Sequence, residues 1–153
     1  MTFLPLLVLA GLAVLPLRAD DGRPLILPFD LTLGGVKAQV EEGNQLFASI
    51  GEPVKPDAVL KLEKPVPMLI VNAFPCHDDG TVDQAAPAAV IFAQNTDQVK
   101  LDATIDGKKL APGSYLANVV AESKTSRIVF TIAKPGEGKK VDFSKIFRFL
   151  KKG

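Results

Sequence analysis

The chain has no tryptophan, one tyrosine, one cysteine and one histidine. A single cysteine cannot form a disulfide within the chain. One histidine is too few for a blue-copper site, which needs two histidines and a cysteine. A serine hydrolase would have only His77 as its base, and the chain has no Gly-x-Ser-x-Gly segment. These shortages leave few residues for catalysis, and they also remove most of the aromatic side chains that line substrate clefts.

An excess of charge of one sign is also missing, because 18 basic side chains accompany 17 acidic ones, for a net charge of +1. This balance argues against nucleic acid as a partner. Neither of the standard glycine-rich phosphate-binding patterns is present. The distribution is uneven, since from Lys134 onward seven basic side chains accompany only two acidic ones. Positive charge therefore gathers at the C-terminal end.

Residues 3–17 form an apolar run, and the segment Leu17-Arg18-Ala19 at its end offers a cleavage site before Asp20. The run has about 15 residues, whereas a membrane-spanning helix needs roughly 20. An apolar segment of this length followed by a small residue is typical of a secretory signal peptide, although no basic residue precedes this one. We expect cleavage after residues 1–19, so that a secreted or periplasmic protein begins near Asp20.

Residues 20–133 show the alternation of short β-strands separated by turns. Apolar and polar residues alternate on both sides of Gly34-Gly35, which indicates a β-hairpin, and Glu42-Gly43-Asn44 predicts the next turn. Two nearly unbroken apolar runs, residues 68–74 and 88–94, predict strands buried on both faces. The other expected strands are residues 25–33, 36–40, 45–50, 58–63, 99–105, 114–121 and 127–132.

This pattern predicts an all-β fold, an antiparallel β-sandwich of about eight strands followed by a short C-terminal amphipathic helix. Residues 106–115 contain an Asp106-Gly107 turn and a Pro112-Gly113 turn that leads into Tyr115 and the next strand. This segment resembles the late strands of immunoglobulin-like or transthyretin-like modules, and the resemblance implies a sandwich. The Cys…Trp…Cys markers of a true immunoglobulin domain are absent.

Residues 134–153 are predicted to be a basic linker followed by the helix, with Asp142 as its N-cap. An apolar stripe on this helix is expected to pack across the sandwich. The alternative is reversible contact with an anionic membrane surface or an acidic partner. The stripe consists of Phe143, Ile146, Phe147 and Leu150, and the candidate contact residues are Lys145, Arg148, Lys151 and Lys152.

The loop between the two apolar runs holds the cysteine and the histidine of the chain. Its acids could supply oxygen ligands to calcium, although their spacing is not that of an EF-hand. A zinc site here would have to mix thiolate and imidazole with carboxylates. The simpler expectation is a buried, unreactive cysteine beside a solvated loop. The candidate metal ligands are Cys76, His77, Asp78, Asp79 and Asp83.

The sequence therefore favours an exported, non-catalytic binding or accessory module of the cell envelope, which is not an enzyme and needs no cofactor. Its expected partner is an envelope protein or a small ligand. One alternative is an extracytoplasmic metal-binding protein that uses residues 76–83. A second is a small hydrolase with a hidden site, since any two carboxylates can converge in a fold.

Overall fold

The computed structural model describes residues 26–136 and 141–152, so the predicted signal peptide and residues 137–140 of the linker lie outside this part. The described chain is mostly β, as the sequence predicts, and ends in the expected helix. Its elements are β1 (Leu31–Leu33), β2 (Val36–Lys37), β3 (Ala48–Ser49), β4 (Val59–Cys76), β5 (Ala89–Lys100), β6 (Gly113–Ala121), β7 (Lys124–Ile132) and α1 (Ser144–Lys152).

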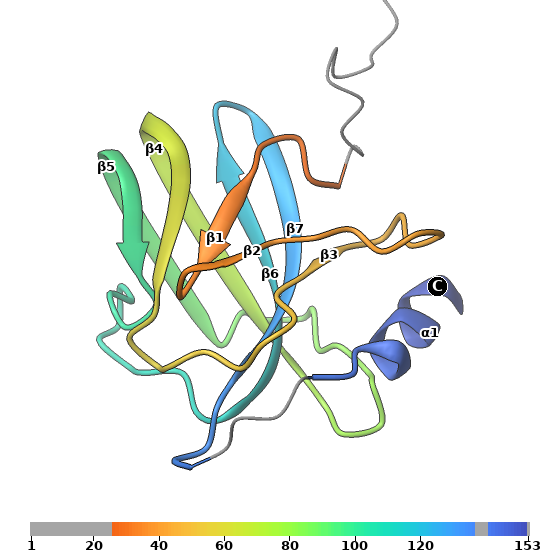
Figure 1. The fold of residues 1–153 in the computed structure, drawn as a ribbon. Coiled ribbons are helices and arrows are strands. Elements are labelled where there is room, and N and C mark those ends of the chain that lie inside the picture. Colours follow the sequence, from red (N-terminus) through yellow and green to blue (C-terminus); the bar gives the residue numbers. More distant parts are fainter. Residues whose placement is uncertain (1–25, 137–140, 153) are drawn as a thin grey trace, which may run out of the picture.

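All seven described strands belong to one sheet, in the order β2-β1-β4-β6-β7-β3, with β5 paired to β4 (Figure 1). Most neighbours are antiparallel, but β3 runs parallel to β7, with Ala48 opposite Ile128. The sheet is therefore mixed, and it curls into a half-barrel. A two-sheet antiparallel sandwich, immunoglobulin-like or otherwise, is not confirmed.

The long strand β4 explains the curl. Two strands were expected at residues 58–63 and 68–74. Instead one continuous strand, which begins at Val59, covers nearly all of both ranges and pairs with β5 along most of its length. On its other edge β4 pairs first with β1 and then with β6. Its register with β5 shifts between Lys61 and Val66, around Pro65, which has no N–H to donate. The irregularity lets one strand belong to two differently oriented parts of the sheet.

The two ends of the strand order are joined by a short bridge. Gln39, just after β2, pairs with Ser49 of β3, and their backbone N–H groups donate to each other's carbonyls at 3.0 and 2.8 Å. The main core fills the space that the curled sheet encloses. Within it Tyr115 stacks on Phe130, with ring centroids 5.7 Å apart, and its hydroxyl donates to the Ala111 carbonyl at 2.6 Å.

The expectation that the two central runs are buried on both faces is wrong. Ile91 is only 2% exposed on the inner face, whereas Met68 is 48% exposed and Phe92 47% exposed on the outer face. The reason is that α1 covers only the part of the outer face near the end of β4. The alternation expected through residues 99–105 also fails, because β5 ends at Lys100 and Ile105 is 70% exposed.

The helix lies beside the sheet (Figure 1). Its predicted apolar stripe packs on the outer face of the sheet. Phe143 and Ile146 are buried in a second apolar cluster that also contains Leu116 of β6 and Val129 of β7. Leu116 and Val129 lie opposite each other in the sheet, so both point to the side that α1 covers. In the described part of the chain no helix has the length and apolar character needed to cross a membrane.

Candidate functional site

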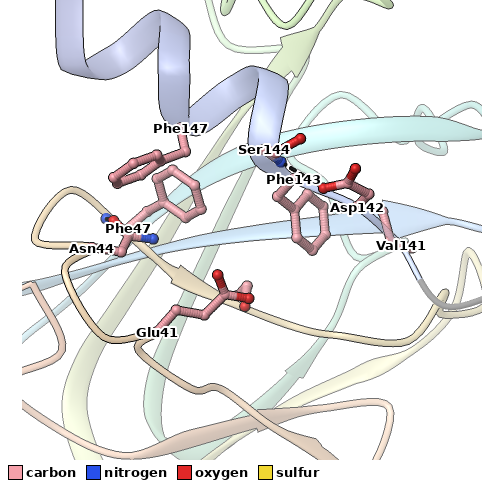
Figure 2. Close-up of a pocket in the computed structure, with 9 residues that line it drawn as sticks. Glu41, Asn44, Phe47, Val141, Asp142, Phe143, Ser144 and Phe147 are labelled. Carbon is pink, nitrogen blue, oxygen red and sulfur yellow. Dashed lines mark hydrogen bonds between the residues drawn. The ribbon is translucent and has the colours of Figure 1, made fainter.

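A pocket of about 380 Å³ lies between the start of α1 and the segment that leads into β3 (Figure 2). We call it the helix-side pocket. Its two walls come from residues 41–49 and 141–147, which are far apart in sequence and are brought together because α1 docks on the outer face of the sheet. The lining residues are Glu41, Asn44, Phe47, Ser49, Val141, Asp142, Phe143, Ser144 and Phe147.

A turn centred on Glu42 and Gly43 shapes the wall that leads into β3. The backbone N–H of Asn44 donates to the Glu41 carbonyl at 3.0 Å, and Gly43 has a φ of 76°, which glycine adopts without strain. The buried Asn44 side chain accepts from the backbone N–H groups of Leu46 at 3.0 Å and Phe47 at 3.4 Å. These bonds fix the segment and hold the Phe47 ring, which is 1% exposed, against the helix.

The helix wall is organised by its cap. Asp142 Oδ1 accepts from the Ser144 N–H at 2.9 Å, as expected for an N-cap residue. Hydrogen bonds from Ser144 lower the pKa of the exposed Asp142 carboxyl, and the charges of Lys145 and Arg148 lower it further. Phe147, one turn into the helix, meets Phe47 edge to face with ring centroids 6.3 Å apart.

The lining of the helix-side pocket combines aromatic rings with two carboxylates. Figure 2 shows the Glu41 side chain reaching toward the rings of Phe47 and Phe143, while Asp142 turns to Ser144. The Glu41 side chain is exposed and makes no hydrogen bond or ion pair with another described residue. Among residues 26–136 and 141–152, no lysine, arginine or histidine lines the pocket. It therefore offers one uncommitted negative charge beside apolar surface, an arrangement suited to holding a ligand.

The candidate metal loop forms a narrow hairpin. The backbones of Cys76 and Val82 form an isolated antiparallel β-bridge, and the His77 N–H donates to the Thr81 carbonyl at 2.8 Å. Within this hairpin His77 is exposed while Cys76 is half-buried, so the two side chains lie in different environments. Adjacent residues in an extended segment point to opposite sides, and the structure does not bring this cysteine and histidine together as a site.

Two of the acids of that loop, Asp79 and Asp83, are engaged by their own loop. Asp79 Oδ1 accepts from the Thr81 hydroxyl at 2.7 Å and its N–H at 2.9 Å, and these bonds lower the pKa of Asp79. Asp83 Oδ1 accepts from the Ala85 N–H at 3.1 Å. The Asp78 carbonyl accepts from the Lys145 ammonium at 3.4 Å. Among residues 26–136 and 141–152, no group of three or more His, Cys, Asp or Glu side chains is placed to hold a metal ion.

Cys76 lies at the end of β4, at the margin of the cluster beneath α1. Burial raises the pKa of its thiol to about 11, against a smaller lowering by a hydrogen bond with the Leu116 backbone. A thiol that stays protonated at neutral pH is a poor nucleophile and a poor metal ligand, because the thiolate is the reactive form. The geometry thus favours the packing role that the sequence suggested for this cysteine.

The predicted contact residues of the helix are all on its solvent side. Lys145, Arg148, Lys151 and Lys152 are exposed, while the apolar stripe faces the sheet. Lys151 places its ammonium 5.8 Å from the centroid of the Phe147 ring. No acidic residue lies between positions 144 and 152, so this surface carries four positive charges.

Sequence reasoning missed the helix-side pocket. It identified the turn at residues 42–44 and the cap at Asp142, but nothing in the sequence linked the two. A usable signal was the helix stripe itself, because Phe143 and Phe147 require an apolar partner such as Phe47. Comparison of the chain with known proteins found no matching family model, no similar curated protein and no similar solved structure.

Proposed function

We propose that the chain is an exported, non-catalytic binding or accessory module of the cell envelope, and that its ligand site is the helix-side pocket. The observation that supports this most directly is the pocket itself. Its volume of about 380 Å³ falls within the range of small-molecule sites, roughly 300–1,000 Å³. Such sites combine apolar and aromatic walls with a few polar groups, as this one does.

Preorganisation of the pocket also supports a binding role. The wall that leads into β3 is fixed by the hydrogen bonds of Asn44, and the helix wall is fixed by the Asp142 cap and the contact between Phe47 and Phe147. A site whose walls are already ordered spends less free energy on ordering when a ligand binds. A small ligand, or one side chain of an envelope protein, would fit a space of this size.

Export is part of the proposal because of the apolar run at residues 3–17 and the Ala19 that follows it. Intact-mass measurement of the protein recovered from the envelope or the medium tests this part. We expect the mass of a chain that begins near Asp20. The mass of a chain that still contains residues 1–19 would contradict export with cleavage.

The binding site is tested by a fragment screen that records ¹⁵N–¹H NMR spectra of the protein. We expect the amide shifts of hits to cluster at Phe47, Ser49 and Ser144. Ser49→Leu should weaken those hits, because the larger side chain fills the pocket from the wall of β3. Ser144→Trp, at an exposed position on the rim, is a second blocking variant if the first one fails to fold. Thr125→Leu on β7, a position outside the lining, is the matched control.

Two results would overturn the pocket assignment. One is a set of hits whose shifts map to another part of the surface. The other is unchanged affinity in a blocking variant whose far-UV circular dichroism and melting temperature match the wild type.

A second candidate function is electrostatic docking of α1 on an anionic membrane surface or an acidic partner. It is supported by the four exposed basic side chains and by the absence of acidic residues between positions 144 and 152. The apolar stripe already packs on the sheet, so such docking would depend on charge and would weaken as salt rises. Cosedimentation with phosphatidylglycerol vesicles at low and high salt tests this, and Arg148→Glu combined with Lys152→Glu should abolish it. Absence of cosedimentation at low salt would exclude docking on such a membrane.

A further inference from the structure

We infer that the helix-side pocket takes the positively charged end of an organic ligand, a primary ammonium or guanidinium carried on an apolar stem. This inference rests on the proposed function, since it names the ligand class of the same pocket. The counter-ion is the carboxylate of Glu41, and the half-buried ring of Phe147, packed beside the buried Phe47 and Phe143, contacts the stem and the cation.

The charge balance of the lining selects a cation. In the described part of the chain, Glu41 and Asp142 bring two negative charges to the lining, and none of the nine described lining residues is basic. Two effects oppose this charge: the helix dipole at the start of α1 amounts to roughly half a positive charge, and the charges of Lys145 and Arg148 act on Asp142. That half charge is already met by Asp142, which accepts the Ser144 N–H. These positive charges all act at Asp142, so Glu41 remains as the uncommitted charge of the described lining and favours a cation over an anion.

The aromatic walls favour the same ligand. The face of a phenylalanine ring attracts an ammonium or guanidinium within about 6 Å of its centroid. The protein itself shows this with one of the pocket rings, because the Lys151 ammonium lies 5.8 Å from the centroid of Phe147 without lining the pocket. Phe47 is 1% exposed and Phe143 is 8% exposed, so the half-buried Phe147 is the phenylalanine of the lining with ring surface open to a ligand.

A bare metal ion fits this pocket less well than an organic cation. Calcium takes about six to eight oxygen ligands. Here the Asp142 carboxylate accepts the Ser144 N–H of the helix cap, and the side-chain oxygen of Asn44 accepts two backbone N–H groups. Glu41 is left as the uncommitted carboxylate of the described lining. Three phenylalanines offer no ligand atoms at all. An organic cation uses both the carboxylate and the rings.

The inference is tested with two probes that differ in charge, Nα-acetyl-lysine methylamide and its uncharged analogue Nα-acetyl-norleucine methylamide. Titration of the wild-type protein followed by ¹⁵N–¹H NMR should give saturable shifts at Phe47, Ser49 and Ser144 with the lysine probe. The norleucine probe should bind about tenfold more weakly, as the loss of a cation–π contact and a carboxylate contact implies. Added sodium chloride should weaken only the lysine probe.

Glu41→Gln should reduce the affinity of the lysine probe several-fold and leave the norleucine probe unchanged. Glu42→Gln is the matched control, because Glu42 is the adjacent exposed acid and does not line the pocket. Equal binding of the two probes, or an equal effect of both variants, would overturn the inference while the pocket remains a binding site. Uncharged or anionic fragments that bind the pocket more tightly than the lysine probe would do the same. If no compound of any class shifts the pocket amides, both this inference and the proposed binding site fail.

Discussion

Replacing Gly80 with alanine should detach or displace α1. Gly80 has a φ of 90°, and a Cβ built on it would lie 2.6 Å from the backbone carbon and oxygen of Lys145 in the helix. A contact that short with backbone atoms forces the loop and the helix apart. Forced overpacking costs about 1–3 kcal/mol, and a residue with a side chain at this positive φ costs roughly 1–2 kcal/mol more. Together the free energy of unfolding should fall by about 2–5 kcal/mol.

Gly107→Ala separates the two contributions. Gly107 also has a positive φ, of 73°, but no atom lies within 4 Å of the position of its Cβ. This variant should lose only the conformational part, roughly 1–2 kcal/mol. Urea titrations of both variants measure the difference, and hydrogen exchange of the α1 amides shows whether the extra loss belongs to the helix. Equal losses, or unchanged exchange in Gly80→Ala, would mean that the loop does not support the helix.

Three further predictions follow from burial. Ile91→Ala should lower the free energy of unfolding by about 2–5 kcal/mol, whereas Ile70→Ala, at a half-buried position on the outer face, should lower it by only about 1 kcal/mol. Equal losses in a denaturant titration would contradict a sheet with one buried and one partly exposed face. Ile146→Ala should lower the free energy of unfolding by about 2–5 kcal/mol, and Phe149→Ala should lower it by less than about 1 kcal/mol. A melting temperature that Ile146→Ala leaves unchanged would mean that α1 is not docked on the sheet. Because burial raises the pKa of Cys76 from 9.0 to about 11, native protein should react slowly with iodoacetamide at pH 8, and fast alkylation would refute its burial. The thiol has a lower pKa in the unfolded chain than in the folded one, so it ionises first in the unfolded chain. The contribution of the Cys76 thiol to the free energy of unfolding is therefore complete below about pH 9 and is lost as the pH rises toward 11. Cys76→Ser should remove this pH dependence.

Local patterns carried much of the fold. The alternation in residues 114–121 and 127–132 gave two strands with the correct inner faces, and they form the hairpin of β6 and β7. The turn between them is shorter than expected, since Glu122 and Ser123, both at positive φ, complete it in two residues. The helix, its cap at Asp142 and its apolar stripe were likewise predicted. These features depend on neighbours within a few residues, which a sequence records directly.

The architecture depended on distant contacts. Whether residues 58–63 and 68–74 form two strands or one is decided by β5, which pairs with both parts across the irregularity at Pro65. The parallel pairing of Ala48 with Ile128 joins segments about 80 residues apart, and no local pattern specifies it. A period of two shows which side chains share a face, but it leaves open what covers that face. Met68 was therefore expected to be buried and is half exposed.

The candidate site shows the same division. The sequence by itself determined that Asp142 caps a helix, that residues 42–44 turn, and that the stripe containing Phe143 must pack on something apolar. Only the tertiary structure decided that the stripe packs on the outer face of β6 and β7, and that this places the helix start beside Glu41. The physical reason is that an apolar helix stripe can pack on any apolar surface, so its own sequence does not specify which part of the sheet it contacts. The pairing of the stripe with the sheet is a contact between residues that are far apart in the sequence, such as Ile146 with Leu116 and Val129, and no local pattern specifies it.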